Sequence, residues 1–180
     1  MYVLVPKNVD VFLGEENYKI SDFYGGFLYK PKFTNPLKNS FVTQLFGENK
    51  NKLFYKSTGH DGVDYRCKEK TDVFSVTNSR VSNIKDDKSY GKMIVTSHDV
   101  FITNGKLVQY IITYCHLSDT LDTKIGDKIE CGKLIALSGN SGNSTAPHLH
   151  IGCYIAKFGK LEVTDFLNFL WYNFYTILCL

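Results

Sequence analysis

Residues 138–153 read SGNSGNSTAPHLHIGC, in which a Gly/Ser/Asn loop and a proline lead into His148-Leu149-His150. In an extended strand successive side chains point to opposite faces, so His148 and His150 share one face while the apolar residues around them share the other. The next residue on the imidazole face, Gly152, has no side chain to crowd whatever the histidines hold. The pattern predicts a strand with a core on one side and suggests a metal site on the other.

The length and composition indicate one folded, β-rich domain with extensions. The chain has 180 residues, enough to bury a sizeable core, and a hydrophobic fraction of 43%, which argues against disorder. Its net charge of +3 comes without a run of Lys or Arg, so no nucleic-acid partner is expected. The five cysteines are widely spaced and form no CxxC pair, which favours buried free thiols over a disulfide framework or a thiolate zinc site.

Short strand patterns separated by turn residues recur along the chain. Asn104-Gly105 is the clearest hairpin signal among these turns. Because no helical periodicity separates the strand patterns, the sequence predicts an all-β domain built on an antiparallel sheet. Residues 59–65 are expected to be a glycine-bearing turn that brings a histidine and a carboxylate together. The expected strands are residues 41–47, 73–77, 80–85, 92–97, 107–116 and 133–137.

The two ends of the chain are expected to flank this domain. Residues 1–39 alternate apolar runs with turn signals and are predicted to be a β-rich or irregular extension, with the domain at residues 40–170. Residues 171–180 form an apolar aromatic tail. The aromatic C-terminal segment is too short to cross a bilayer, so no stable membrane insertion is expected. The N-terminus lacks the pattern of a secretory signal peptide.

Four histidines occur beside glycines or at strand ends, together with one carboxylate. A catalytic zinc takes three protein ligands from His and Asp or Glu and keeps a position open for water, and these residues supply enough ligands. The histidines left over suit proton transfer and oxyanion stabilisation. His98 has no such neighbours and is interpreted as structural. The candidate set is His60, Asp64, His116, His148 and His150.

Three motifs that contain these residues occur in a fixed order. They are His60-Asp61-Gly62-Val63-Asp64, Tyr114-Cys115-His116-Leu117 and His148-Leu149-His150. Their order and spacing resemble the lysostaphin/LytM family of zinc metallopeptidases, whose signatures are His-x-x-x-Asp, Tyr-x-His-Leu and His-Leu-His. The likeness extends over about residues 41–170 and implies the antiparallel β fold of that family.

The resemblance also implies a role for each residue of the candidate set. His60, Asp64 and His150 would bind one Zn²⁺ per chain. His148 would be the general base that takes a proton from the attacking water, and His116 would position that water and stabilise the tetrahedral intermediate. Asp61 is a rival ligand to Asp64, although the motif favours Asp64.

Strand alternation gives a separate expectation for the segment around His116. Period 2 places Tyr114 and His116 on one face, with Cys115 on the other and pointing away from the site. A Cys115/His116 nucleophile pair is therefore not expected. The loop at residues 138–146 lacks a P-loop lysine and is interpreted as a wall of a substrate cleft. Candidate substrate contacts are Tyr114, Asn140 and Ser144, with Tyr114 more commonly a wall residue.

The predicted function is that of a zinc metalloendopeptidase acting on bacterial peptidoglycan, at a stem peptide or a cross-bridge. Two alternatives stay open: a non-catalytic or latent module that binds cell wall or regulates another hydrolase, and a phage lysin or component of a phage particle. The protein is expected to act on the bacterial cell wall. Without a visible signal peptide, it would be phage-encoded, released by lysis, or missing its leader.

Overall fold

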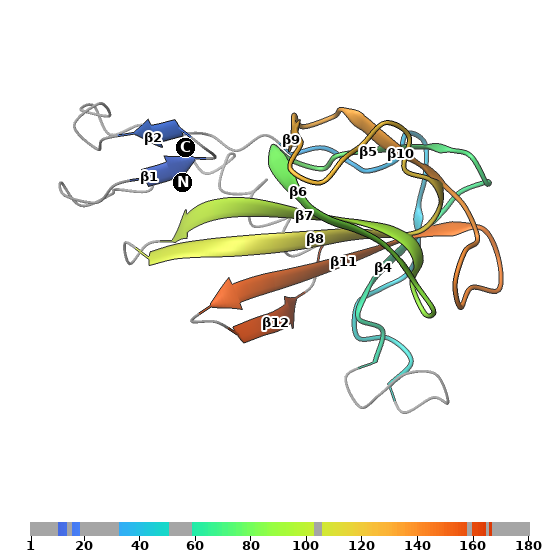
Figure 1. The fold of residues 1–180 in the computed structure, drawn as a ribbon. Helices are drawn as coiled ribbons and strands as arrows, with labels where there is room; N and C mark the ends of the chain where they lie inside the picture. Colours follow the sequence, from blue (N-terminus) through green and yellow to red (C-terminus); the bar gives the residue numbers. More distant parts are fainter. Residues whose placement is uncertain are drawn as a thin grey trace.

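The computed structural model describes residues 11–13, 16–18, 33–50, 59–102, 106–157, 160–164 and 166 (Figure 1). All of the regular elements in this part of the chain are β-strands, apart from a single helical residue at Phe166. The strands are β1 Val11–Leu13, β2 Glu16–Tyr18, β3 Val42–Gln44, β4 Gly62–Arg66, β5 Asp72–Phe74, β6 Ser79–Asp87, β7 Gly91–Ile102, β8 Lys106–Asp119, β9 Lys128–Ile129, β10 Leu134–Ser138, β11 His148–Lys157 and β12 Lys160–Thr164.

Ten of these strands form one sheet, and β1 and β2 pair separately with each other. The main path runs β3-β4-β11-β8-β7-β6-β9, with β12 added to β11 and with β10 paired to β8 and β5. All of these pairings are antiparallel. The long strands β6, β7, β8 and β11 run side by side through the sheet in Figure 1. The prediction of an all-β antiparallel fold is confirmed.

Each strand expected from the sequence pattern has a counterpart in the structure, although its first and last residues differ from the expected ones. The turn expected at Asn104-Gly105 lies outside the described residues, although Ile102 and Lys106 on either side of it pair with each other. The expectation of a turn over residues 59–65 is wrong, because β4 begins at Gly62 within that stretch. The chain extends there because β4 pairs with β3 on one side and with β11 on the other.

Alternation in β11 follows the sequence prediction. Leu149, Ile151 and Cys153 are fully buried in the hydrophobic core, and His148 and His150 lie on the opposite face. The core continues through apolar side chains of β4, β5, β7, β8 and β10, including Val63, Val73, Ile94, Ile112 and Ile135. A rigid apolar layer therefore supports the strand that carries both histidines of the pair.

The four described cysteines, Cys67, Cys115, Cys131 and Cys153, are thiols and not disulfides. This agrees with the expectation of thiols rather than a disulfide framework. Within the described part of the chain, no helix has the length and apolar character needed to cross a membrane. Most of the predicted extension at residues 1–39 and all of the tail at residues 171–180 lie outside the described residues.

Candidate metal centre

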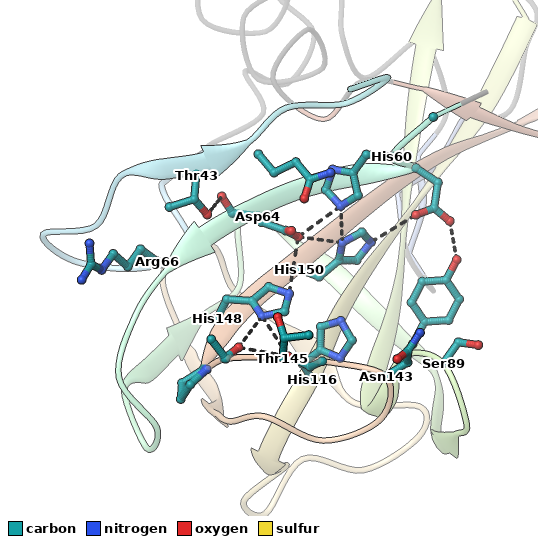
Figure 2. Close-up of a pocket in the computed structure, with 17 residues that line it drawn as sticks. Thr43, His60, Asp64, Arg66, Ser89, His116, Asn143, Thr145, His148 and His150 are labelled. Carbon is teal, nitrogen blue, oxygen red and sulfur yellow. Dashed lines mark hydrogen bonds and ion pairs between the residues drawn. The ribbon is translucent and has the colours of Figure 1, made fainter. Parts of the chain in front are cut away.

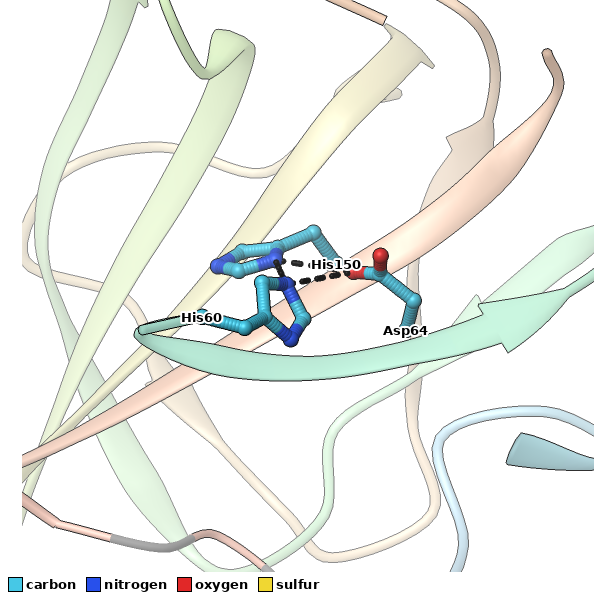
Figure 3. Close-up of side chains that lie close together, drawn as sticks. All are labelled: His60, Asp64 and His150. Atoms are coloured by element: carbon cyan, nitrogen blue, oxygen red, sulfur yellow. Dashed lines mark hydrogen bonds and ion pairs between the residues drawn. The ribbon is translucent and has the colours of Figure 1, made fainter. Parts of the chain in front are cut away.

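Two neighbouring strands bring His60, Asp64 and His150 together (Figure 3). Asp64 on β4 lies directly opposite His150 on β11, and His60 precedes β4 by two residues. The Nδ1 atom of His150 is 2.9 Å from Oδ1 of Asp64, and Nε2 of His60 is 3.2 Å from the same oxygen. The two histidine nitrogens are 3.1 Å apart. One potential ligand atom from each residue thus converges on a single point.

The cluster is shielded from solvent. His60 and His150 are each 3% exposed, and Asp64 is 9% exposed. Burial alone raises the pKa of Asp64, but hydrogen bonds and charges from His150 and His60 outweigh it and lower the pKa well below its usual value. Asp64 is therefore ionised at neutral pH. Two imidazoles and one carboxylate are a donor set that suits zinc.

The backbone around His60 fixes the direction of its ring. Nδ1 of His60 lies 3.1 Å from the carbonyl oxygen of Leu45, so Nδ1–H donates there and Nε2 faces Asp64. The main chain of His60 accepts from Gly47 N–H at 2.7 Å and donates to the Glu48 carbonyl at 2.8 Å. Burial lowers the pKa of His60, but Asp64 and the Leu45 carbonyl raise it above the usual value overall. An outer carbonyl that selects the ring tautomer is the usual support of a metal-binding histidine.

Asp61 lies beside the cluster and not within it. Its Oδ1 is 3.7 Å from Nε2 of His150, on the far side of that ring from Asp64. Its Oδ2 accepts a hydrogen bond from the Tyr90 hydroxyl. The group of possible metal ligands in the described residues contains Asp64 and not Asp61.

His148 and His116 face the same cavity without joining the ligand group. His148 Nδ1 donates to the Ala146 carbonyl at 2.8 Å and lies 3.1 Å from Ser144 Oγ, while Nε2 is 3.6 Å from Asp64 Oδ1. The rings of His148 and His116 have centroids 4.6 Å apart.

His116 is held by its own backbone contact. Its Nδ1 donates to the Ser141 carbonyl at 2.7 Å. Burial lowers the pKa of His116 to about 4, with the neighbouring His148 and His150 acting in the same direction. The ring is therefore neutral at pH 7 and presents a lone pair at Nε2.

A bulge in β8 changes the alternation expected around His116. The β7–β8 register shifts there, so two residues, Cys115 and His116, lie opposite one residue of β7, and His116 has a φ of 59°. Cys115 lies directly opposite His150 in the β8–β11 ladder, which puts both side chains on the same face. The expectation that Cys115 points away from the site is therefore wrong. Burial raises the pKa of its thiol to about 12, so it stays protonated.

Tyr114 lies in the core and not in the cavity, which corrects its assignment as a candidate substrate contact. The side chain is fully buried, and its hydroxyl oxygen accepts a hydrogen bond from Val76 N–H at 2.9 Å. The bulge separates it from His116, because the extra residue turns the histidine to the other face.

Tyr114→Phe is expected to lower the free energy of unfolding by about 1–3 kcal/mol, because it leaves the buried Val76 N–H without its acceptor. The value of kcat/KM should stay at the wild-type level. Chemical denaturation together with steady-state kinetics checks both. A loss of activity without a loss of stability would instead support Tyr114 as a residue that contacts substrate.

The histidines open into a cavity of about 930 Å³ (Figure 2). Ser144 lines it, whereas Asn140 is exposed and is not among the lining residues. Sequence reasoning missed Arg66, Tyr90, Asn143 and Thr145, of which the last two belong to the loop already interpreted as a wall. The remaining lining residues are Thr43, Gln44, Gly59, His60, Asp61, Asp64, Ser89, His116, Ala146, Pro147, His148 and His150.

The glycine that makes room for the cluster is Gly62 and not Gly152. A Cβ at Gly152 would meet Thr113 Oγ1 at 2.6 Å, away from the ligand atoms. A Cβ at Gly62 would lie 2.5 Å from Cε1 and 2.6 Å from Nε2 of His150 and would also meet the Ile151 carbonyl. The glycine of the first motif thus permits the imidazole of the third motif to pack against β4.

Gly62→Ala is expected to displace the His150 ring and weaken metal binding by about 10–100-fold, the usual cost of disturbing the support of a metal ligand. A competition titration with a chromophoric chelator measures the affinity. Gly132→Ala is the control for a loss of stability away from the cluster, because its φ of 81° strains an alanine although nothing lies within 4 Å of the added Cβ. Unchanged affinity in Gly62→Ala would show that the ring does not need this space.

Comparisons with known proteins find a metalloprotease and a peptidoglycan endopeptidase among the similar sequences. Residues 58–160, more than half of the chain, match the family described as Peptidase family M23. An uncharacterized metalloprotease of Buchnera aphidicola is 30% identical over 169 residues, which cover 86% of this chain and 42% of that protein. Peptidoglycan DD-endopeptidase ShyA of Vibrio cholerae is 34% identical over 91 residues, 51% of this chain and 19% of that protein. The chain thus spans less than half of the length of these relatives.

The fold is similar to that of a solved peptidase domain. The catalytic domain of lysostaphin from Staphylococcus simulans superposes with a TM-score of 0.60 at 26% identity, over 73% of this chain and 92% of that domain. The resemblance to lysostaphin/LytM-type metallopeptidases, first indicated by the three motifs, is confirmed by these matches.

Proposed function

We propose that this chain, which belongs to peptidase family M23, is a zinc-dependent endopeptidase that hydrolyses peptide bonds of bacterial peptidoglycan. The observation that carries the proposal is the buried cluster of His60, Asp64 and His150, with two further histidines lining the same cavity. Related proteins are named as peptidoglycan and glycyl-glycine endopeptidases, which indicates the class of substrate.

The three clustered residues would hold the metal. Asp64 would supply an ionised oxygen, and Nε2 of His60 and Nδ1 of His150, which both face that oxygen, would supply imidazole nitrogens. A zinc ion bound there would supply a Lewis acid that polarises the scissile carbonyl and brings the pKa of a water to about 7. Three protein ligands leave a position open, as catalytic zinc sites require.

His148 is proposed as the general base. Because Nδ1–H donates to the Ala146 carbonyl, the lone pair of His148 is at Nε2, and this atom lies 3.6 Å from Asp64 Oδ1. Nε2 is therefore near the position of the attacking water and takes its proton as the C–O bond forms. The same nitrogen then carries the proton that the leaving amine needs when the C–N bond breaks.

His116 is proposed to hold the attacking water and to stabilise the tetrahedral intermediate. In its neutral form Nδ1–H is used by the Ser141 carbonyl, so Nε2 accepts a hydrogen bond from water. It can donate toward an oxyanion only after gaining a proton. Because burial lowers the pKa of His116 to about 4, its proposed role is to accept a hydrogen bond at Nε2 from the attacking water, and then from the hydroxyl that this water becomes on the tetrahedral intermediate.

The open groove next to these histidines suits an extended peptide. Ser144 on one wall is proposed to contact substrate through its exposed surface, beside Asn143 and Thr145. Arg66 lies directly opposite His148 in the β4–β11 ladder and gives the groove one cationic side chain.

The test is mass spectrometry of fragments released from purified peptidoglycans of several cross-link types. The zinc-loaded protein, the chelated protein and the His148→Ala variant are compared. New pairs of amine and carboxyl ends that appear only with the zinc-loaded wild type would establish the endopeptidase and identify the bond. An occupied zinc site with no fragments from any wall type would contradict the proposal and favour a non-catalytic wall-binding module.

A further inference from the structure

The imidazole of His150 has one nitrogen that the metal cluster does not use. Nδ1 faces Asp64 at 2.9 Å, whereas Nε2 points the other way and is buried without a hydrogen-bond partner. An unpaired buried N–H is costly, and a metal-binding histidine normally gives its second nitrogen a partner. The nearest anionic oxygen recorded for Nε2 is Oδ1 of Asp61, at 3.7 Å.

Asp61 is itself fixed from its other side. Its Oδ2 accepts a hydrogen bond from the hydroxyl of Tyr90, and the Tyr90 ring lies 5.7 Å from the His150 ring, centroid to centroid. Tyr90 belongs to the turn between β6 and β7, where Asp87 accepts from the main-chain N–H groups of Ser89 and Tyr90. The Tyr90 hydroxyl therefore reaches Asp61 from a backbone that is anchored independently of the metal cluster.

The same turn is tied to the other catalytic candidates. The carbonyl of Tyr90 accepts from His116 N–H at 2.8 Å, and Gly91 packs directly against Ser141. The contacts connect in the order Tyr90, Asp61, His150, Asp64. The carboxylate of Asp61 thus stands behind the ring, opposite the ligand nitrogen, where it can align the ring and increase its basicity.

We propose that Asp61, held by Tyr90, is a positioning residue that orients His150 and strengthens its binding to the metal. The proposal rests on the proposed metal site and adds a role for the second residue of the first motif, which is not itself one of the clustered ligands. It predicts that the Asp61 carboxylate and the Tyr90 hydroxyl act on metal affinity through a single path.

The experiment measures zinc affinity by competition with a chromophoric chelator, which does not depend on turnover. Asp61→Asn, Tyr90→Phe, the double variant and Asp61→Glu are compared with wild type. Asp86→Asn is the matched control, because Asp86 is an exposed carboxylate on β6 and loses the same charge. The Asp61 side chain is 37% exposed, so asparagine fits there without repacking the core.

Asp61→Asn is expected to weaken zinc binding by about 10–100-fold, and Tyr90→Phe by a smaller factor. The double variant should be no weaker than Asp61→Asn, and Asp61→Glu should recover part of the loss. The melting temperatures of the metal-free proteins should stay close to wild type, which a purely structural role would not allow.

Zinc affinity of Asp61→Asn equal to wild type would overturn the proposal, and so would a loss equal to that of Asp86→Asn, which would reflect net charge alone. If the double variant lost as much zinc affinity as the two single variants combined, Tyr90 and Asp61 would act independently, which would contradict a single path. If the variants change zinc affinity as predicted but the wild-type protein cleaves no peptidoglycan, the proposed function fails while this inference stands. If wild type binds no zinc, both fail.

Discussion

Asp64→Ala is expected to abolish both zinc binding and peptide hydrolysis. The carboxylate of Asp64 lies within 3.2 Å of both histidine nitrogens of the cluster, and without it only two imidazole ligands remain. Zinc content, measured by mass spectrometry of metals after dialysis, should fall from about one per chain to background. Turnover should fall by a factor of at least about 10³, because the reaction loses its Lewis acid.

Glu69→Gln is the control for this result, since Glu69 is an exposed carboxylate outside the cavity. It should retain zinc and activity. His150→Ala should behave as Asp64→Ala does, because it removes another member of the same cluster. Full zinc content in either variant would contradict the ligand assignment. Far-ultraviolet circular dichroism of the metal-free proteins separates metal loss from unfolding.

His148→Ala is expected to keep zinc and lose turnover by about 10²–10⁴-fold, the usual contribution of a general base. The reason is geometric: Nε2 of His148 is 3.6 Å from the Asp64 oxygen, yet the residue does not belong to the clustered ligands. The loss should be in kcat, with a small change in KM, because the groove walls are unaltered.

His98→Gln provides the matched control for a buried histidine. His98 Nδ1 donates to the Asn78 carbonyl, and the ring lies edge-on to Phe33 outside the cavity. The substitution should reduce stability and leave kcat and zinc content at wild-type levels. Loss of zinc in His148→Ala would make His148 a ligand, and full turnover would remove it from the mechanism.

Strand alternation predicted the histidine pair because it depends only on local geometry. Leu149 and Ile151 are apolar residues that a folded chain buries, so His148 and His150, at the alternate positions, were expected on the opposite face. Strand β11 has this arrangement. The three motifs also indicated the family, because each contains histidine or aspartate residues at the spacing that the family signatures have. These local predictions hold in the folded protein because pairing with neighbouring strands stabilises the same extended conformation.

Long-range packing accounts for what the sequence did not reveal. β4 looked like a turn because Gly59 and Gly62 are turn residues, yet Gly62 is needed for close approach of the His150 ring. The bulge at Cys115 and His116 depends on pairing with β7 and reverses the alternation that assigned Cys115 to the wrong face. Tyr90 reaches the site from a turn whose position is set by contacts with residues about 50 positions away.

X-ray absorption at the zinc edge of the purified protein tests the central claim most directly. The account predicts one zinc per chain with a shell of nitrogen and oxygen atoms at about 2.0–2.2 Å and no sulfur, lost in Asp64→Ala. A sulfur shell at about 2.3 Å would mean that cysteines bind the metal. That result, or an unaltered shell in Asp64→Ala, would contradict the centre formed by His60, Asp64 and His150.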